Sequence, residues 1–467
     1  MTTSTAGTAG QSLESLGRVH FIGIGGVGMS AVARIMVARG VPVTGSDAKD
    51  LPVMADLAAA GAGIHVGYSA GNLGAAEAVV AGSAIRADNP ELQAARAAGL
   101  PVLHRSEALA AAMAGDRVVT VAGTHGKSTT TSMVTVLLQG AGLDPTFAIG
   151  ANVPSLGVNA ASGTSDIFVA EADESDGSFL NYRPQIAVVT NVEPDHLDYY
   201  GTAEAVYESF DRFTELLPAD GVLVACADDP GARALAERTK ARGNTRVMTY
   251  GTAEDAQLRL HDGGPGDVSV STGAGRFALD LQVPGRHNAL NAAAAFAVAL
   301  ELGVAPDTAS AALAHFSGAS RRFEFKGEGR GVRVYDDYAH HPTEVRAALA
   351  AARSVAGDHK VHVLFQPHLF SRTREFAAEF AEALNAADTA LVLDIYPARE
   401  DPIPGVSSKL IGDRLSEAGQ LVAAEDAVRA VVANAAAGDI VLTAGAGDVT
   451  AYGPLIVEAL LAEAPGG

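Results

Sequence analysis

The chain has 467 residues, which is longer than one hydrophobic core usually supports, and this length predicts roughly three domains. Its 54 acidic and 33 basic residues give a net charge of -21, which repels nucleic acid and anionic membranes and excludes both as expected partners. A single cysteine, Cys226, excludes an internal disulfide framework and predicts a reducing, cytoplasmic compartment. Because no long apolar run or secretory signal is present, we expect a flexible tail at residues 1–17 and no membrane insertion.

The first predicted domain, residues 18–114, begins with a strand, a glycine turn and a helix, and a second strand follows. The glycines let the backbone approach a pyrophosphate, and an acid after the second strand is well placed for a ribose hydroxyl. This pattern predicts a nucleoside diphosphate site, and taken alone it also fits a nicotinamide or flavin enzyme. The residues of the predicted site are Gly25, Gly26, Gly28, Met29, Ser30 and Asp47.

The second predicted domain, residues 115–325, carries the strongest motif, a strand that runs into a phosphate-binding loop and a helix. We expect a surface-facing Lys127 to bridge the outer phosphates of a nucleotide, and the Ser128 hydroxyl to ligate the accompanying Mg²⁺. The loop is shorter than the common P-loop, because Val121 stands where that pattern has glycine. The alternative is an ordinary strand-to-helix turn. The loop residues are Gly123, Thr124, His125, Gly126, Lys127, Ser128 and Thr129.

Two further apolar strands of this domain end in acidic clusters. Residues 166–170 lead into the acidic segment, residues 171–176, and residues 186–192 lead into a second cluster that includes His196. In a parallel sheet both clusters fall at the carboxyl edge, beside the phosphate loop, and oxygen ligands there suit Mg²⁺. A solvated surface loop is the alternative for such charged residues.

Polar residues also mark the end of the second domain. Residues 287–291 open an Ala-rich helix, where His and Asn are either ligand contacts or simple helix caps. The neighbouring Arg321 and Arg322 either clamp a phosphoryl group or pair with surface carboxylates.

The third predicted domain, residues 326–467, is another alternation of strands and helices with polar strand ends. Two adjacent histidines, His340 and His341, follow its first strand. Because neighbouring positions on a strand point apart, we expect hydrogen-bonding roles for them rather than joint binding of one metal ion.

These motifs, in this order and over nearly the whole chain, resemble those of the Mur ligases, the ATP-dependent enzymes that build the peptide stem of the bacterial cell-wall precursor. The similar stretches are Gly-Thr-His-Gly-Lys-Ser-Thr-Thr at 123–130, Glu-Ala-Asp-Glu-Ser-Asp at 171–176, Asn-Val-Glu-Pro-Asp-His at 191–196, Pro-Gly-Arg-His-Asn-Ala-Leu-Asn at 284–291, Arg-Arg-Phe-Glu at 321–324, Asp-Asp-Tyr-Ala-His-His-Pro-Thr-Glu at 336–344 and Gly-Ala-Gly-Asp at 445–448.

The resemblance implies an α/β protein with three domains: a Rossmann-like UDP-binding domain, a central P-loop ATPase domain and a C-terminal Rossmann-like domain that binds the amino acid. It also implies ATP and Mg²⁺ as cofactors. The implied reaction joins L-alanine to the lactyl carboxylate of UDP-N-acetylmuramate through an acyl phosphate, in peptidoglycan precursor synthesis.

The resemblance also implies residue roles. The implied catalytic residues are Lys127, Glu171, His196, Arg322 and His340, and the implied Mg²⁺ ligands are Ser128, Glu171 and His196. Further implied ATP contacts are His287 and Asn291 at the adenine, Arg322 at the phosphates and Asp337 at the ribose. The implied amino-acid contacts are His368 and Arg372, with Arg372 preferred for the carboxylate because Leu369 stands where family members often have Arg.

Three alternatives remain open from the sequence. A recycling ligase of the same family would add a tripeptide to the same UDP-sugar. A nicotinamide dehydrogenase would explain the first domain only. A non-catalytic nucleotide-binding switch would need the phosphate loop but not the polar strand ends of the third domain.

Overall fold

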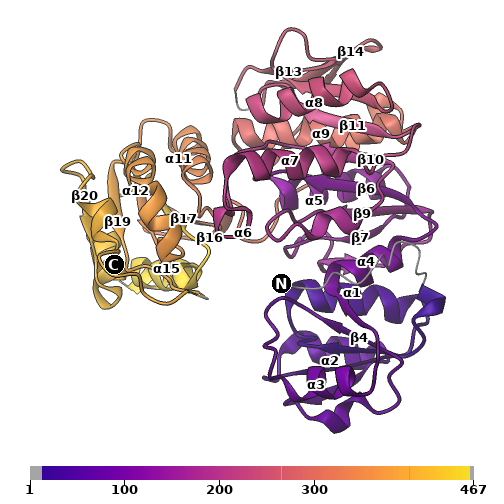
Figure 1. Cartoon of the computed structure of the whole chain (residues 1–467). Helices are drawn as coiled ribbons and strands as arrows, with labels where there is room; N and C mark the ends of the chain where they lie inside the picture. The colour runs from indigo at the N-terminus through magenta and orange to yellow at the C-terminus, as the bar shows by residue number, and fades with distance from the viewer. Residues whose placement is uncertain (1–12, 265, 399, 463–467) are drawn as a thin grey trace. The chain divides into compact units, whose positions relative to one another are not determined.

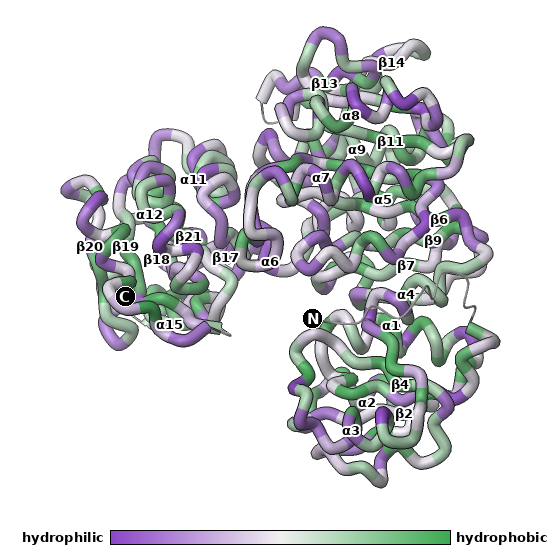
Figure 2. Tube along the Cα trace, in the orientation of Figure 1, coloured by the Kyte–Doolittle hydropathy of each residue, from purple (hydrophilic) through white to green (hydrophobic). Residues whose placement is uncertain are grey.

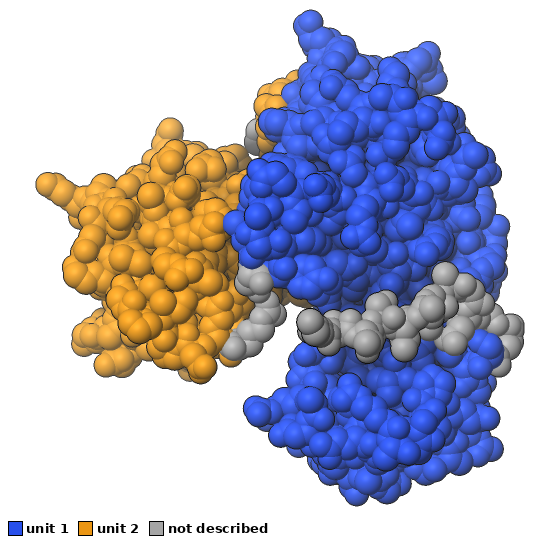
Figure 3. Space-filling view, in the orientation of Figure 1, with its two compact units in different colours: residues 1–261, 269–280, 290–316 blue, residues 262–268, 281–289, 317–467 orange. Residues whose placement is uncertain are grey.

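The structure is a computed structural model of the chain, and it describes residues 13–264, 266–398 and 400–462 (Figure 1). The chain divides into two compact units, which Figure 3 distinguishes by colour. Unit 1 comprises residues 1–261, 269–280 and 290–316, and unit 2 comprises residues 262–268, 281–289 and 317–467. Among the described residues, no helix is both long and apolar enough to span a bilayer.

Sheet A lies in unit 1 and has five parallel strands in the order β3-β2-β1-β4-β5. The strand order reverses at β1, and in open α/β sheets ligands bind beyond the carboxyl ends of the strands at such a point. The strands are β1 (Val19–Ile22), β2 (Val43–Asp47), β3 (Gly63–Val66), β4 (Ala78–Ala81) and β5 (Val102–His104). The helices around it are η1 (Leu13–Ser15), α1 (Val27–Ala38), α2 (Pro52–Ala59), η2 (Ala70–Leu73), α3 (Pro90–Ala97) and α4 (Arg105–Met113).

A buried carboxylate, Glu91, holds the centre of this sheet in register. It accepts hydrogen bonds from Asn72 Nδ2 at 2.7 Å, from the Ser69 amide at 3.1 Å and from the Ser46 hydroxyl, and His20 Nε2 lies 3.3 Å away. Burial alone would raise the pKa of Glu91, but these hydrogen bonds outweigh burial and lower it. The network therefore fixes the end of β2, where the predicted ligand site begins.

Sheet B, also in unit 1, has ten strands in the order β15-β14-β13-β12-β11-β10-β6-β9-β7-β8. The central strands are buried along their length and read as continuous apolar runs, as expected for a parallel sheet covered on both faces (Figure 2). The strands are β6 (Arg117–Ala122), β7 (Thr146–Ala148), β8 (Ala160–Ala161), β9 (Ile167–Glu171), β10 (Ile186–Val189), β11 (Val222–Cys226), β12 (Arg246–Gly251), β13 (Leu258–Asp262), β14 (Val268–Thr272) and β15 (Gly275–Ala278). The helices are α5 (Lys127–Gly140), η3 (Ser178–Asn181), α6 (Leu197–Tyr200), α7 (Ala203–Thr214), α8 (Pro230–Arg242), α9 (Arg286–Glu301) and α10 (Pro306–Leu313).

Arg39 joins the two halves of unit 1. Its guanidinium lies at the end of α1 and donates hydrogen bonds to the Asp116 carboxylate at 2.7 Å and to the Thr146 hydroxyl at 3.1 Å. It also lies 5.5 Å from the centre of the Phe168 ring. These contacts anchor α1 of sheet A to the strands of sheet B.

Sheet C lies in unit 2 and has six strands in the order β16-β17-β21-β18-β19-β20, with only β16 antiparallel to its neighbour. Apolar clusters cover both faces, one formed with α11 and α12 and the other with α14 and α15. The strands are β16 (Glu324–Gly329), β17 (Val332–Asp337), β18 (Val361–Phe365), β19 (Thr389–Val392), β20 (Gly419–Leu421) and β21 (Ile440–Ala444). The helices are α11 (Pro342–Ala356), α12 (Phe370–Leu384), α13 (Lys409–Gly412), η4 (Ala424–Asp426), α14 (Ala427–Asn434), η5 (Asp448–Ala451) and α15 (Tyr452–Ala462).

The predicted α/β class, with Rossmann-like sheets at both ends of the chain, is confirmed. Strand ends differ by a few residues: Asp47 and Glu171 are the last residues of β2 and β9, whereas the sequence placed them just beyond their strands. Strand β10 ends at Val189, before the predicted end, because the residues that follow turn toward the phosphate loop. Of the predicted tail, residues 1–12 lie outside the described residues, and Leu13–Ser15 form a 3-10 turn.

Candidate active site

The phosphate loop follows β6, the strand that lies between β9 and β10 in sheet B. Gly123 has φ +133°, and Gly126, at the start of α5, has φ +80°. A Cβ at Gly123 would lie 2.1 Å from Thr190 Oγ1, so the loop geometry requires glycine there. The predicted order of strand, glycine turn and helix is therefore confirmed.

Two residues beyond β10 brace this loop. Thr190 Oγ1 donates a hydrogen bond to the His125 carbonyl at 2.6 Å, and Asn191 Nδ2 donates to the same carbonyl at 3.0 Å. Asn191 Oδ1 in turn accepts from the His125 amide at 2.7 Å. The sequence analysis did not identify this role, although a Thr-Asn pair directly after a buried strand was the available signal. The pair therefore holds the loop in shape through both backbone polar groups of His125.

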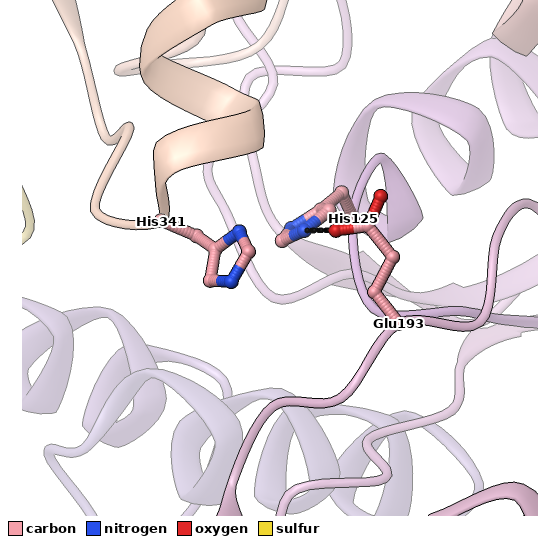
Figure 4. Close-up of side chains that lie close together, drawn as sticks. All are labelled: His125, Glu193 and His341. Carbon is pink, nitrogen blue, oxygen red and sulfur yellow. Dashed lines mark hydrogen bonds and ion pairs between the residues drawn. The ribbon is translucent and has the colours of Figure 1, made fainter. Parts of the chain in front are cut away.

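His125 and Glu193 form a further contact at the same edge of sheet B. His125 Nε2 lies 3.3 Å from Glu193 Oε2, as Figure 4 shows. The Glu193 amide also donates a hydrogen bond to Thr124 Oγ1, in the phosphate loop, at 2.9 Å. The residues after β10 thus contact the loop through both side chains and backbone.

Lys127 forms an ion pair with Glu174, a residue of the acidic segment 171–176 for which the sequence predicted no individual role. Lys127 Nζ donates to Glu174 Oε1 at 2.8 Å and to the carbonyls of Gly123 and Thr124 at 2.8 and 3.2 Å. The side chains are 14% and 2% exposed, so the expectation of a surface-facing lysine is wrong. Lys127 instead curls back over its own loop and neutralises a buried carboxylate.

Electrostatics of this pair follow from burial and from neighbouring charges. Burial lowers the pKa of Lys127, but the carboxylates of Glu174, Asp173 and Glu171 outweigh burial and leave the pKa raised. Burial raises the pKa of Glu174 to about 7 against the opposing effect of Lys127. Lys127 is therefore cationic at neutral pH. Its ammonium group can contact a phosphate group when it leaves Glu174.

The acidic ends of β9 and β10 lie on either side of the phosphate loop, as the sequence predicted. Glu171 Oε2 accepts a hydrogen bond from the Gly150 amide at 2.8 Å. His196 has φ +54° and places Nε2 3.7 Å from both Glu174 Oε1 and Asp195 Oδ2. Ser128 and Glu171 carry oxygen donors, the ligand type that Mg²⁺ prefers, whereas His196 carries an imidazole nitrogen, which suits transition metals better.

In sheet A, the glycine turn after β1 is held by Asp47. Asp47 Oδ2 accepts a hydrogen bond from the Gly25 amide at 3.0 Å, so this carboxylate shapes the turn. A Cβ at Gly25 would lie 2.5 Å from Leu51 Cδ1, and one at Gly28 would lie 2.6 Å from Arg105 Nη1. A side chain at either position would therefore displace Leu51 or Arg105 from its present place.

Asn291, on α9, lies against the phosphate loop. A Cβ at Gly126 would lie 2.9 Å from Asn291 Oδ1, and the Asn291 side chain is buried. The structure therefore brings Asn291 together with the loop within unit 1. Asn288, three residues earlier, donates a hydrogen bond to the Pro284 carbonyl at 2.7 Å and so stabilises the start of α9.

In unit 2, the two neighbouring arginines have different surroundings. Arg321 Nε lies 3.2 Å from the buried carboxylate of Asp336, and its Nη2 donates to the Gly445 carbonyl at 2.6 Å. Arg322 has a loose ion pair with Glu344, at 3.7 Å, and its guanidinium lies 5.3 Å from the Tyr338 ring centre. The contacts of Arg321 stabilise the fold, so Arg322 is the better candidate for a phosphate contact.

Asp337, the last residue of β17, is buried with both oxygens bonded. Oδ2 accepts from the Phe323 amide and Oδ1 from the Ala339 amide, each at 2.8 Å. Burial raises the pKa of Asp337 to about 7, although Arg322 opposes this rise. The carboxylate thus sits at the carboxyl edge of sheet C, next to the arginine pair.

His340 and His341 lie in the turn between β17 and α11, and not on a strand as the sequence argument assumed. His340 Nδ1 donates to the Tyr338 carbonyl at 2.9 Å, which leaves the lone pair of a neutral ring on Nε2. His341 caps α11 by accepting from the Thr343 amide at 3.4 Å. The predicted hydrogen-bonding roles are confirmed for both rings.

The predicted amino-acid contacts lie after β18. The His368 ring stacks on Tyr396 at 5.8 Å and an interplanar angle of 13°, and it meets the His340 ring at 6.0 Å. The next residue, Leu369, has φ +71° and starts α12, whose first turn carries the buried Arg372. The structure thus brings His340 and His368 together at one sheet edge, and Tyr396 is a further residue that the sequence analysis missed.

His287 provides a pH test of unit 2. Burial and, to a smaller extent, the nearby Arg322 together lower the pKa of His287 to about 4. Because the unfolded chain gains a proton below about pH 6.5 and the folded chain only below pH 4, this group costs stability as pH falls through that window, by about 1 to 2 kcal/mol at pH 5 after screening. We expect NMR of labelled histidines, assigned with His287→Gln, to show a neutral ring at pH 5. A midpoint near 6.5 would contradict the burial of this ring.

The sequence is similar to those of known proteins. It matches the Mur ligase family catalytic domain over residues 18–117, the Mur ligase middle domain over residues 121–299 and the Mur ligase glutamate ligase domain over residues 321–447. These matches agree with three mainly parallel α/β sheets and with a phosphate loop flanked by acidic strand ends. The chain belongs to the Mur ligase family, and a nicotinamide dehydrogenase is thereby excluded.

Individual relatives show which members of the Mur ligase family this chain is similar to. The chain is 97% identical over 467 residues to the UDP-N-acetylmuramate–L-alanine ligase of Arthrobacter sp. (strain FB24), with 100% of each chain covered. It is 79% identical to the protein of the same name from Paenarthrobacter aurescens (strain TC1), covering 98% of this chain and 100% of that one. A crystal structure of UDP-N-acetylmuramate-alanine ligase from Thermotoga maritima superposes with a TM-score of 0.77 at 29% identity, covering 95% of this chain and 98% of that one.

Proposed function

We propose that this chain is an ATP-dependent ligase that joins L-alanine to the lactyl carboxylate of UDP-N-acetylmuramate in peptidoglycan precursor synthesis. The observation that carries this proposal is the 97% identity over the full length to a protein with that activity in its name. The phosphate loop, the acidic strand ends and the basic residues of sheet C supply the chemical groups that such a ligase needs. We assign the reaction to the cytoplasm, where ATP and the UDP-sugar are made.

We further propose three domains, residues 18–114, 115–325 and 326–467, that bind the UDP-sugar, ATP and the amino acid. The proposed UDP-sugar contacts are Gly25, Gly26, Gly28, Met29, Ser30 and Asp47. The proposed ATP contacts are Gly123, Thr124, His125, Gly126, Lys127, Ser128, Thr129, His287, Asn291, Arg322 and Asp337. The proposed amino-acid contacts are His368 and Arg372.

The reaction requires an activated carboxylate, because an amine does not displace oxide from a carboxylate in water. The γ-phosphoryl group of ATP passes to the lactyl carboxylate, which forms an acyl phosphate. The alanine amine then attacks the acyl carbon, and inorganic phosphate leaves. Fixed positive charges stabilise the charge that spreads over the phosphoryl oxygens during transfer.

Lys127 and Arg322 are the cations that we assign to this role, with His340 near the transferring group. Lys127 contacts Glu174 at 2.8 Å, so it must exchange this carboxylate for phosphate when it binds the nucleotide. Ser128, Glu171 and His196 would hold Mg²⁺, which when bound neutralises phosphate charge. The oxygen donors of Ser128 and Glu171 support this assignment, because Mg²⁺ prefers oxygen ligands.

The Mg²⁺ assignment has a binding test that does not depend on turnover. We expect Ser128→Ala to reduce about tenfold the gain in ATP affinity that Mg²⁺ produces, because one hydroxyl ligand is lost. Ser128→Thr keeps the hydroxyl and should keep the gain. Calorimetric titration of ATP with and without Mg²⁺ measures this difference. An unchanged gain in Ser128→Ala would remove Ser128 from the ligand set.

The acceptor is tested by offering L-alanine, glycine, L-serine and an alanyl-glutamyl tripeptide separately, each with UDP-N-acetylmuramate and MgATP. Mass spectrometry identifies the products. We expect L-alanine to be preferred, and glycine and L-serine to be slower but detectable, since a pocket discriminates weakly over one carbon. Preferential use of the tripeptide would replace the proposal by the recycling ligase.

Arg372 is expected to bind the alanine carboxylate. Arg372→Ala should raise the KM for L-alanine about ten- to hundredfold through loss of a charge-assisted contact, with ATP and UDP-sugar affinities nearly unchanged. Arg374, two residues along α12 and exposed, gives a control of equal charge change in Arg374→Ala. Equal KM values for Arg372→Ala and the unmodified chain would retain the reaction and refute the residue.

A further inference from the structure

Arg105, the first residue of α4, has surroundings that the fold alone does not explain. Its side chain is 27% exposed, yet the guanidinium donates no hydrogen bond to any described residue. Its nearest carboxylate is Asp173 of the acidic segment, with Nη2 to Oδ2 at 3.7 Å. That separation exceeds the usual 2.7 to 2.9 Å or so of a charge-assisted hydrogen bond. Arg39, in the same unit, donates instead to Asp116 and to Thr146.

The guanidinium lies beside the glycine turn after β1. A Cβ placed on Gly28 would be 2.6 Å from Arg105 Nη1 and 2.9 Å from its Cδ, so the side chain passes directly over this residue. Gly28 is the second residue of α1, whose first amides face the site proposed for the diphosphate. A five-donor planar cation is thus held next to a set of backbone donors, which is the combination that binds phosphate groups bidentately.

Hydrogen bonds hold the residues on either side of Arg105 more firmly than the guanidinium of Arg105 itself. Ser106 Oγ accepts a hydrogen bond from Asn181 Nδ2 at 2.8 Å, which ties α4 to the segment after β9. On the other side, His104 Nε2 lies 3.1 Å from Ser83 Oγ, and that hydroxyl donates to Asp176 at 3.3 Å. The flanking residues therefore anchor the start of α4 to the acidic segment while the guanidinium keeps its donors available.

We propose that Arg105 binds the diphosphate of the UDP-sugar and that it exchanges Asp173 for this ligand. The inference rests on the proposed function for the identity of the sugar nucleotide. Without ligand, Asp173 partly neutralises Arg105 through the loose ion pair. With ligand, the guanidinium turns to the phosphate oxygens and Asp173 loses its partner beside Lys127. Arg105 is thus a binding residue, and Asp173 is its internal competitor.

Opposite changes in UDP affinity in two variants, Arg105→Ala and Asp173→Asn, distinguish this exchange from a merely structural ion pair. We expect Arg105→Ala to weaken binding of UDP and of UDP-N-acetylmuramate by about ten- to a hundredfold, because a charge-assisted contact is lost. Arg105→Lys should recover only part of this loss, since an ammonium lacks the planar fork. Asp173→Asn should tighten UDP binding a few-fold, because the competitor is neutralised. A structural pair would weaken binding in both variants.

The experiment is calorimetric titration of the full chain with UDP, UDP-N-acetylmuramate and uridine. Uridine lacks phosphate, so its affinity should not respond to Arg105→Ala. Arg96→Ala, an exposed arginine on α3, is the matched control for a change of net charge. Thermal unfolding of each variant checks the fold, and Arg105→Lys keeps the test valid if Arg105→Ala unfolds.

Unchanged UDP affinity in Arg105→Ala would overturn the proposal, and so would weaker UDP binding in Asp173→Asn. Equal losses for uridine and UDP would likewise refute a diphosphate contact. Failure of the unmodified chain to bind any uridine nucleotide would instead count against the proposed function, so the two failures are distinguishable.

Discussion

Lys127→Ala is expected to lower the rate of ligation by about 10³-fold or more, because the cation that we assign to the outer phosphates is removed from the transition state. The same change leaves Glu174 buried without its partner at 2.8 Å. Loss of a buried charged partner costs on the order of 1 to 3 kcal/mol, so the variant should also unfold at a lower temperature.

The double variant Lys127→Ala with Glu174→Gln separates these two effects. Neutralising Glu174 should restore most of the thermal stability, since no uncompensated carboxylate remains. It should not restore ligation, because no cation returns to the phosphates. Recovery of turnover in the double variant would show that Lys127 serves only to neutralise Glu174.

Gly123→Ala is expected to abolish nucleotide binding, with a loss of affinity of at least about a hundredfold. The new methyl carbon would lie 2.1 Å from Thr190 Oγ1 and 3.0 Å from the Asn191 carbonyl, at a φ of +133°. The loop must therefore move away from the residues that brace it, and its amides lose their common direction. Titration with MgATP measures the loss.

Gly61→Ala is the matched control, because Gly61 has φ +109° and open space around its Cβ position. It carries the backbone strain of a positive φ without the steric clash, at a cost of about 1 kcal/mol. Its nucleotide affinity should equal that of the unmodified chain. Normal MgATP binding by Gly123→Ala would mean that this loop is not the nucleotide site.

Much of this site could be predicted from the sequence because its signals are local. The strand, the glycines and Lys127 are consecutive, and apolar runs identified β9 and β10 with their acidic ends. Adjacency of those ends to the loop followed from the general behaviour of parallel sheets. The strand order β10-β6-β9 confirms that step.

What the sequence did not predict depends on contacts between distant residues. The pairing of Lys127 with Glu174 joins positions 47 residues apart, and the same acidic segment offers several carboxylates with no local feature to choose between them. The different roles of Arg321 and Arg322 depend on which of them reaches Asp336 and Gly445. The stacking of His368 on Tyr396 joins the ends of two strands, and no spacing rule indicates it.

The acyl phosphate pathway is tested most directly by an isotope measurement. UDP-N-acetylmuramate labelled with ¹⁸O in its lactyl carboxylate is incubated with the chain, L-alanine and MgATP, and the released phosphate is analysed by mass spectrometry. The proposed function predicts one ¹⁸O atom in each inorganic phosphate and UDP-N-acetylmuramoyl-L-alanine as the product, in equal amounts with ADP. Label found in AMP, or phosphate released without ¹⁸O, would contradict carboxylate activation by phosphoryl transfer.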